Sequence, residues 1–561
     1  MKIRIVNLLP LLLLIATSLV AQSNPQTVSD SEVQRDPVLR AMSEELQRSK
    51  EQLKLADMQR PYYLEYSVVD VEQYSAEAEF GGLRVDQRAR TRILRAVVRI
   101  GDYKQDSYYR SGEGVVELLP TDNDVEAIRH QLWLATDEAY KRAAAALTEK
   151  LAALKQIETA QEVDDFSHEQ PAHYFASSAP IPRDLESWRD TLKAVSAIYT
   201  LDPQLQSWRA DLNFTTQTRY FINSEGTVLR HSIPYYTLSI LGNTQSSDGM
   251  RLDLGRTWAV TDVKELPATS EVRSAAEELI KTLGELRTAP QVEEEYRGPV
   301  LMSPDASSTL FANLVAPNIS GRKPRFGTFG RTAGDYASSY KMRVLPDFIT
   351  LIDDPTQATS NGRSLLGFYS YDDEGVAARP VTVVDKGVLV NYLVGRQPIR
   401  DFTISNGHGR STTAGAANPH IGNLFVKVQN PLRPEDLKAK LIQMCKDQGR
   451  AYGYLAKSLS GASSPRLLYR VYASDGHEEL VRGAVFNQLD TRAIRTDLIA
   501  AGDDGRVDNR AEQIPNSIIA PSLLFDELEI KRSNQGKEKL PLYPPPDVQG
   551  KTPTVKAAGA Q

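Results

Sequence analysis

The chain has 561 residues, 41% of them apolar and 25% charged, and its formal net charge is −6. This length exceeds what one hydrophobic core usually organises, so we expect two or three domains. The composition is that of a globular protein and excludes collagen-like and low-complexity chains. An acidic chain without a long run of lysine or arginine lacks the electrostatic footprint of a nucleic-acid-binding protein, which argues against DNA or RNA as a partner.

Residues 1–21 have the features of a secretory signal peptide. Lys2 and Arg4 form a positive start, Leu8 to Ala16 is a short apolar stretch, and small residues follow. The apolar run is too short to span a membrane comfortably, so we expect cleavage rather than an uncleaved anchor. The sequence therefore predicts an exported protein, periplasmic or extracellular, with no stable membrane insertion. Residues 22–35 are interpreted as a linker.

Residues 36–295 carry the signals of an α/β domain, in which apolar residues recur at helical and then at strand intervals. We expect the long Ala-rich helix to place Trp133, Tyr140 and Leu151 on or near one apolar stripe. The predicted elements are a helix that starts at Asp36 and that Pro61 ends, strands from Tyr62 to about Tyr109, a helix from Asp124 to Gln156, a polar loop from Glu162 to His173, strands from Leu212 to Arg230 around an Asn223–Gly226 turn, and a helix from Glu271 to about Arg287 capped by Ser270.

A domain boundary is predicted near residue 295, where Pro290 and the acidic run Glu293–Glu295 interrupt the pattern. We interpret the three glutamates as a solvated linker and not as a metal site. Residues 296–532 then contain many short strands separated by Gly, Asp and Asn turns, which indicates a large, mainly antiparallel β domain. The predicted fold class is therefore α+β.

The β-rich region has the following predicted elements: strands at Phe348–Ile352, Val381–Val384, Val388–Val394, Leu467–Tyr472 and Glu479–Phe486, and a helix from Arg433 to Arg450. Residues 533–561 include Pro544–Pro546 and are predicted to be a disordered tail. Cys445, the only cysteine, lies in the helical pattern with Leu437 and Leu441. It is interpreted as a buried small hydrophobe rather than a nucleophile, and a single thiol leaves no internal disulfide.

The most informative motif is Asp372-Asp373-Glu374-Gly375-Val376. Asp353-Asp354-Pro355-Thr356 precedes it, and Ser405-Asn406-Gly407-His408-Gly409-Arg410 follows it. In order and spacing these motifs resemble the C-terminal half of the TldD/PmbA family, whose TldD-type members are metal-dependent peptidases. The Asn223–Gly226 turn is also similar to one in that family, so the resemblance extends into the first half of the chain.

The same resemblance reveals missing zinc ligands. Gly298-Pro299-Val300 is present, and Ser303-Pro304 opens a helix through Leu314 or Val315. The His-Glu-x-x-x-His residues that the family implies would fall near Phe311, Ala312 and Ala316, none of which can bind a metal or act as a base. The implied cysteine ligand is also missing between Ala501 and Pro515. The chain therefore resembles PmbA-type members, which pair with TldD-type partners; no zinc cofactor is expected, and no catalytic residue transfers.

Two chemical alternatives stay open. His408 and His420 lie near a carboxylate-rich cluster and could form an oxygen and nitrogen metal site, or the acids could merely shape turns. Asp373 and Glu374 could act as acid and base if burial separates their pKa values.

No Gly-x-Ser-x-Gly elbow or phosphate-binding loop is present in the sequence. The candidate residues for the cleft are Asp353, Asp354, Asp372, Asp373, Glu374, His408, Arg410 and His420.

Three functions follow from this sequence. The first is a metal-free protein that binds peptides or supports a TldD-type catalytic partner, as a homo- or hetero-dimer around an enclosed cleft. The second is a peptidase with a rearranged site, and the third is an extracytoplasmic scaffold without a peptide substrate. Stoichiometric metal that is lost on His408→Ala or His420→Ala would favour the second function.

Overall fold

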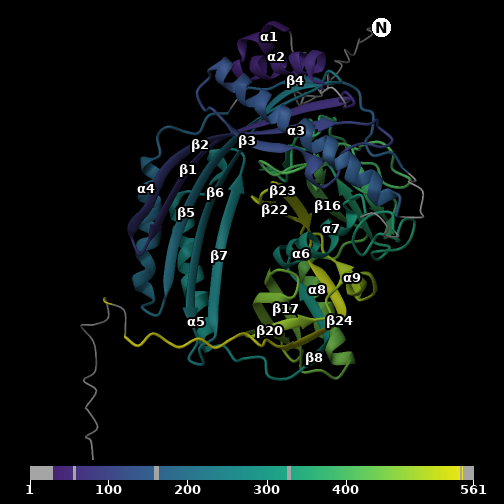
Figure 1. Ribbon diagram of the computed structural model, residues 1–561. Coiled ribbons are helices and arrows are strands. Elements are labelled where there is room, and N and C mark those ends of the chain that lie inside the picture. Colours follow the sequence, from purple (N-terminus) through teal and green to yellow (C-terminus); the bar gives the residue numbers. More distant parts are fainter. Residues whose placement is uncertain are drawn as a thin grey trace, which may run out of the picture.

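The computed structural model describes residues 30–54, 58–156, 163–177, 179–324, 330–543 and 546. Figure 1 shows a long, curved sheet formed by the N-terminal half of the chain, with the C-terminal half packed beside it. The predicted α+β fold class is confirmed, since helices accompany sheets that are mostly antiparallel.

The N-terminal half is built on one sheet with the order β3-β2-β1-β5-β6-β4, and β7 also pairs with β6. Every pairing in it is antiparallel except that of β4 with β6. Four of its strands are 17 or 18 residues long. The strands are β1 (Tyr63–Glu79), β2 (Gly82–Arg99), β3 (Val115–Leu119), β4 (His173–Phe175), β5 (Ser207–Asn223), β6 (Val228–Gln245) and β7 (Arg251–Val260).

One face of this sheet is covered by helices. Even-numbered residues of β1 point to the helices, with Leu64 and Tyr66 under α2 and α3 at one end and Tyr74 and Ala76 under α4 and α5 at the other. Because side chains alternate along a strand, the odd-numbered residues face the C-terminal half. The helices are α1 (Asp30–Arg35), α2 (Pro37–Gln52), α3 (Val125–Leu154), α4 (Glu186–Ser196) and α5 (Thr269–Thr288), with short 3-10 turns η1 (Arg110–Glu113), η2 (Ala197–Leu201) and η3 (Val263–Glu265).

Some helix predictions need correction. The buried face of α3 contains Ile128, Leu132 and Tyr140, whereas Trp133 and Leu151 are exposed, because α2 and the sheet contact a face rotated from the predicted stripe. Helix α2 starts at the predicted Asp36 cap, whose carboxylate accepts from two backbone amides. It ends at Gln52, well before the predicted stop at Pro61.

The start of α5 also differs from the prediction. Its N-cap is Ala268 and not Ser270, and the cap makes no side-chain hydrogen bond. The hydroxyl of the first helical residue, Thr269, lies 2.6 Å from that of Thr191 on α4. Packing between the two helices therefore accompanies the earlier start, a contact that local capping preferences cannot anticipate. The Asn223–Gly226 turn between β5 and β6 is confirmed, with Gly226 at φ 106°.

The C-terminal half contains two larger sheets, with orders β13-β12-β9-β16-β23-β22 and β19-β18-β17-β8-β24-β20; β21 also pairs with β24. Pairings are antiparallel except β16–β23 and β17–β8. The strands are β8 (Tyr296–Met302), β9 (Ile349–Asp353), β10 (Thr359–Ser360), β11 (Arg363–Ser364), β12 (Val381–Asp385), β13 (Val388–Leu389), β14 (Gly409–Arg410), β15 (Asn418–Pro419), β16 (Asn423–Val428), β17 (Tyr452–Ser460), β18 (Ser464–Tyr472), β19 (Glu478–Val481), β20 (Ala484–Asn487), β21 (Leu498–Ala501), β22 (Arg506–Arg510), β23 (Asn516–Ala520) and β24 (Leu523–Arg532).

Helices α6 (Pro304–Leu310), α7 (Ala316–Ile319), α8 (Pro434–Asp447) and α9 (Thr491–Thr496) accompany these sheets, and η4 (Phe311–Val315) is a π-type turn between α6 and α7. The predicted strand Glu479–Phe486 is two strands, because Gly483 turns at φ 69° between them. The predicted strand Val388–Val394 is shorter and ends at Leu389. Cys445 is buried on α8, as predicted.

The start of the predicted tail lies against the N-terminal half. Met250 and Lys537 form an antiparallel bridge, and the Glu538 N–H donates to the Gly249 carbonyl at 3.0 Å. Figure 1 shows this yellow segment running from the C-terminal half past the start of β7. The predicted signal peptide and all but the final part of the linker lie outside the described residues. Within the described ranges, no helix is long and apolar enough to cross a membrane.

Replacement of Leu212 by alanine tests the packing of the long sheet. Leu212 is fully buried between β5 and the helices α4 and α5, so Leu212→Ala should lower the free energy of unfolding by about 2–5 kcal/mol. Leu118→Ala, at a β3 position that is 67% exposed, is the matched control and should change it little. Urea unfolding followed by circular dichroism measures both, and equal losses would contradict this packing.

Candidate functional site

The Asp372–Val376 segment forms a tight turn held by its first carboxylate. Asp372 accepts the N–H groups of Glu374 and Val376 at 3.0 and 2.8 Å, and that of Gly409 at 2.9 Å. Gly375 has φ 86°, and a Cβ there would lie 2.9 Å from the ring of Phe221 on β5. Burial and the neighbouring Glu374 raise the pKa of Asp372, while the N–H donors oppose that shift. The motif thus shapes a turn pressed against the N-terminal sheet.

Asp373 joins the two halves of the chain. Its carboxylate lies 3.2 Å from Arg219 Nη1 of β5 and 3.4 Å from Arg410 Nε of β14, and it accepts the Ser411 N–H at 2.7 Å. Burial disfavours ionisation, but the two arginines outweigh it and lower the pKa of Asp373. Arg410 also stacks on Tyr369, with 4.2 Å from its guanidinium carbon to the ring centre. Asp373 is therefore an ionised carboxylate that is bound by two arginines and one backbone N–H group.

His231 on β6 faces the same ion pair, a contact that the sequence did not reveal. It pairs in register with Arg219, and its buried Nε2 has no protein hydrogen-bond partner. Burial lowers the pKa of His231 to about 4, with Arg219 and Arg410 acting in the same direction and Asp373 opposing them. The imidazole is therefore neutral near pH 7, leaving two arginines and one carboxylate as the charges of this cluster.

Glu374 differs from its neighbour in both contacts and charge. One carboxylate oxygen accepts the Arg396 N–H at 2.7 Å. Gly395 and Gly409 make room for this carboxylate, because a Cβ on either glycine would lie within 2.3 Å of it. Burial raises the pKa of Glu374 to about 7, with Glu65 adding to the shift and Arg396 opposing it. Glu374 is therefore a partly exposed acid that changes protonation near neutral pH.

Arg396 makes a second buried connection between the halves. Its guanidinium donates to both oxygens of Glu225, at 2.7 and 2.9 Å, and to the Ser167 carbonyl at 2.6 Å. It also lies over Phe166, 3.9 Å from the ring centre. Glu225 belongs to the Asn223–Gly226 turn, and residues 166 and 167 to the predicted polar loop. Neither segment was a predicted site, because only the folded chain brings them to Arg396.

His408 and Asp353 form a contact inside the C-terminal half. His408 Nε2 lies 3.1 Å from Asp353 Oδ1, and His408 Nδ1 lies 3.0 Å from the Asn406 carbonyl. Both side chains are 0% exposed. Asp353 also accepts the Gly422 N–H, and Asp354 accepts from Thr356 and Gln357 in its own turn. These residues hold turns together, and none of them lines the cavities described below.

His420 is not joined to His408 in a metal-binding arrangement. Its Nδ1 lies 2.9 Å from the Ile421 carbonyl, and burial lowers its pKa. Among the residues that the structure describes, no group of three or more His, Cys, Asp or Glu side chains is placed to hold a metal ion. The alternative metal site at these two histidines thus has no geometric support in the described ranges.

The helix that would carry zinc ligands in TldD-type proteins is apolar here. Ser303 caps α6 as predicted, accepting the Ala306 N–H. Phe311 and Ala316 are buried in the core of the C-terminal half, and Ala312 packs against it. In the segment that should supply the third ligand, both oxygens of Asp504 are bound to Ser522. A benzyl group and two methyl groups offer no donor atom, so this position does not fit a zinc ion.

A groove runs between the two halves, and we call it the central groove. Glu374 lines two narrow crevices of about 20 and 10 Å³. A wider basin of about 550 Å³ shares Tyr108 with the first crevice and Lys323 and Gln397 with the second. The N-terminal half contributes Glu65, Arg95, Arg99 and Tyr108, and the C-terminal half contributes Asp373, Glu374, Ser411, Gly415 and Ala417. Of the predicted cleft residues, Asp373 and Glu374 line this groove. The structure places Asp353, Asp354, Asp372, His408, Arg410 and His420 behind it, in the supporting turns.

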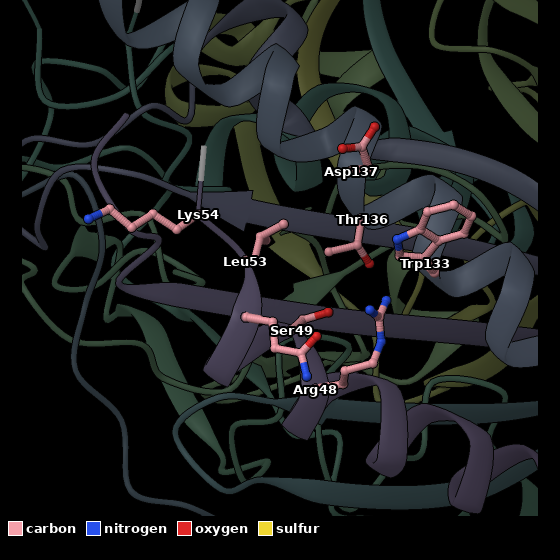
Figure 2. A pocket seen from close by; sticks show the side chains of 8 residues that line it. Arg48, Ser49, Leu53, Lys54, Trp133, Thr136 and Asp137 are labelled. Atoms are coloured by element: carbon pink, nitrogen blue, oxygen red, sulfur yellow. The ribbon is translucent and has the colours of Figure 1, made fainter. Parts of the chain in front are cut away.

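A separate cavity of about 190 Å³ lies between α2 and α3, where Arg48 and Ser49 approach Trp133 and Thr136 (Figure 2). Two of its charged groups have partners close by along their own helices. Arg48 pairs with Glu45, and Asp137 lies 2.5 Å from Lys141. The cavity has no residue in common with the central groove.

Comparison with known proteins identifies the class. Residues 295–532 match the family model described as the PmbA/TldA metallopeptidase C-terminal domain. The fold is similar to TldE from Thermococcus kodakarensis (TM-score 0.58, 16% identity, 88% of this chain and 100% of that one). It is also similar to a Thermotoga maritima protein described as a modulator of DNA gyrase (TM-score 0.60, 14% identity, 88% and 99%). Residues 295–532 therefore form a domain of the TldD/PmbA family, and the fold of the chain is similar to that of TldE.

Two curated relatives are named as metalloproteases. One, from Archaeoglobus fulgidus, is 28% identical over 23% of this chain and 26% of its own length. The other, from Methanocaldococcus jannaschii, is 33% identical over 15% of this chain and 18% of its own length. The matched segments thus span about a quarter of these relatives or less, so the relatives' activity does not transfer with the match.

Glu374→Gln tests the protonation of the groove carboxylate. Its folded-state pKa of about 7 exceeds the ordinary 4.5, so the folded chain keeps a proton that the unfolded chain releases above pH 4.5. The stability that this proton contributes is present at low pH and is lost as pH rises through about 7. Because glutamine cannot ionise, the variant should be more stable than the native chain by about 3 kcal/mol at about pH 8 and nearly equal to it near pH 4.5.

Thermal unfolding across that pH range measures the difference. Glu293→Gln, in the exposed acidic run near the start of β8, is the matched control and should follow the native chain at every pH. A difference in melting temperature between Glu374→Gln and the native chain that stays the same at every pH would contradict the raised pKa of Glu374.

Proposed function

We propose that this chain is an exported, metal-free member of the TldD/PmbA family that binds peptides in the central groove. In this proposal it acts as the non-hydrolytic subunit beside a TldD-type metallopeptidase in a hetero-dimer, or binds peptides as a homo-dimer. The observation that carries the proposal is the apolar helix at Phe311, Ala312 and Ala316, because water cannot be activated by zinc where no side chain can bind it.

The shape and chemistry of the central groove favour an extended peptide. The groove is lined by both halves and presents carboxylates, guanidinium groups, the Tyr108 phenol and the small side chains between Ser411 and Ala417. Peptide backbones need donors and acceptors along their length, and this mixture supplies them. The narrow crevices beside Glu374 admit only groups of about the size of a water molecule, whereas the basin is large enough for side chains.

Export is proposed from the signal-like residues 1–21. A single, buried cysteine is compatible with an oxidising compartment, because no exposed thiol would be available for unwanted disulfides. Mature protein would then begin after the small residues that end near Ala21.

A rearranged peptidase is the second candidate, and the chemistry of Glu374 favours it. Asp373 has a lowered pKa and Glu374 a raised one, the separation that acid–base catalysis by two carboxylates requires. However, the Asp373 oxygens are engaged by Arg219, Arg410 and Ser411, so only Glu374 could exchange a proton with a substrate. The non-hydrolytic proposal therefore ranks first, and a scaffold without peptide binding ranks third.

Metal analysis of the purified mature chain distinguishes these candidates. We expect less than stoichiometric transition metal by mass spectrometry and an unchanged melting temperature after chelator treatment, because no described cluster of ligands couples metal to folding. The same preparation should bind unfolded peptides in titration calorimetry without cleaving them. Mixing it with a TldD-type chain that carries an intact His-Glu-x-x-x-His helix should restore hydrolysis.

Three results would overturn this assignment in different ways. Stoichiometric metal that disappears in His408→Ala or His420→Ala would establish a rearranged metal site. Metal-independent cleavage that Glu374→Gln abolishes would establish acid–base hydrolysis. No binding of any peptide would favour the scaffold.

Cell fractionation tests export. The full chain should appear in the periplasm or medium, with an N-terminus that lacks residues 1–21, because the apolar stretch is long enough for a signal peptide and short for an anchor. A variant with Leu12→Arg in the apolar stretch should stay in the cytoplasm at full length. Retention of the native chain in the cytoplasm, or in the membrane fraction with its leader attached, would contradict the prediction.

A further inference from the structure

A short hairpin loop lines the central groove beside Glu374. It consists of Ser411–Ala417, joins β14 to β15, and is called the flap below. Its two stem strands pair through two residue pairs. At its base, Asp373 accepts the Ser411 N–H at 2.7 Å, and Arg219 donates to the Ser411 carbonyl at 3.1 Å. The base of the flap is therefore fixed to the ion pair that joins the two halves of the chain.

The tip of the flap has no such anchor among the residues that the structure describes. Its hydrogen bonds there run from the Gly415 N–H to Thr412 Oγ1 at 3.0 Å and from Asn418 Nδ2 to the Ala416 carbonyl at 3.1 Å, so both stay within the hairpin. Residues 412–417 are half-buried and have small side chains. Little packing is lost when such a segment moves, and segments with few buried contacts open most easily.

Alternate residues of the flap line the groove. Its odd-numbered residues line the first crevice, and its even-numbered residues do not. Side chains alternate in this way along an extended strand. The wall from the N-terminal half includes Glu65 of β1 and Arg95 and Arg99 of β2. The flap therefore lies in the central groove as an extended peptide would, and its inner side consists of Ser411, Thr413, Gly415 and Ala417.

The flap also separates the spaces around Glu374. Glu374 and Ala417 are the two residues that line both narrow crevices. The crevice volumes of about 20 and 10 Å³ correspond to at most about one water molecule each, so no peptide residue fits beside Glu374 while the flap is in place. Displacement of the flap would join the two crevices to each other and to the basin, which already shares Lys323 with the second.

We propose that the flap is an internal occupant of the peptide site, which a peptide must displace to reach Glu374, and that the peptide residues received there have small side chains. Both parts have one cause, because the walls of the groove already fit the small side chains of the flap. A larger side chain would have to force these walls apart, and overpacking of this kind is destabilising. The inference rests on the proposed peptide-binding function and names its ligand class, a peptide of Gly, Ala, Ser and Thr residues.

Deletion of Gly415–Ala417 tests the flap as an occupant. The deletion leaves four residues, Ser411–Ala414, between the stem strands, a length that hairpins accept. The probe is the heptapeptide Ser-Thr-Thr-Ala-Gly-Ala-Ala with both ends blocked, which has the sequence of the flap and carries no charge. In titration calorimetry the shortened chain should bind it about tenfold more tightly than the native chain, because a tethered competitor is removed. A deletion of equal length in the exposed tail, Leu540–Leu542, is the matched control and should bind the probe as the native chain does.

A second heptapeptide tests the size of the accepted side chains. Its sequence is Ser-Thr-Leu-Leu-Leu-Ala-Ala, again with blocked ends. Three consecutive leucines place at least one large side chain on the inner side in either register, because side chains alternate along the peptide. The shortened chain should bind this peptide about tenfold more weakly than the flap peptide. Leucine offers more apolar area than alanine or glycine, so weaker binding would report size and not hydrophobicity.

Hydrogen exchange tests the flap without any peptide. The Arg396 N–H donates to Glu374 at 2.7 Å, and the neighbouring Gly395 lines the second crevice together with Ala417. In the shortened chain this amide should exchange about tenfold faster than in the native chain, because its cover is removed. Mass spectrometry of a fragment that contains residues 395–397 measures the rate. Amides of α3, which is distant in sequence and outside both crevices, should exchange equally in the two chains.

Three results would overturn the inference in distinguishable ways. Equal affinity of the native and shortened chains for the flap peptide, with unchanged exchange at Arg396, would show that the flap does not occupy the site. Equal or tighter binding of the leucine peptide to the shortened chain would remove the small-residue ligand class. No binding of either peptide, with faster exchange at Arg396, would leave the flap as a cover of Glu374 and remove the ligand class together with the proposed peptide-binding function.

Discussion

The buried ion pair of Asp373 with Arg219 and Arg410 is the constraint on which the rest of the site depends. Arg219 comes from the long N-terminal sheet and Arg410 from the C-terminal half, so their common carboxylate fixes one half against the other. Ion pairs of this kind pay a desolvation cost, and removal of one member leaves uncompensated charge. The position of Asp373 therefore sets the walls of the central groove.

The same turn that makes this connection presents Glu374 to the groove. Asp372 holds the turn by accepting backbone N–H groups. Gly395 and Gly409 have no side chains and so leave space for the carboxylate of Glu374. Two adjacent acids consequently have opposite properties, since Asp373 is stabilised as an anion and Glu374 is held near neutrality. Structural and ligand-facing roles are thus divided between consecutive residues of one short motif.

Loss of the zinc-binding side chains has not removed the family fold. The segment around Phe311 stays helical and contributes to the core, and it includes a π-type turn at η4. Fold and chemistry are separable, because packing needs only apolar side chains at these positions whereas metal binding needs specific donor atoms. A binding subunit can therefore preserve the groove of a peptidase without its reaction, which is the arrangement proposed for this chain.

The sequence by itself determined the features that depend on local patterns: the α+β class, the caps at Asp36 and Ser303, the Asn223–Gly226 turn and the lack of a zinc donor at Phe311, Ala312 and Ala316. Motif order also identified Asp373 and Glu374. The tertiary structure alone decided the surroundings of Asp373, because Arg219 and His231 are distant in sequence and lie in unremarkable patterns. It also paired Glu225 with Arg396. It also decided that His408 is sealed within a turn. Periodicity reports which face of a segment is buried, but charge balance and pKa depend on contacts that form only when distant segments pack together.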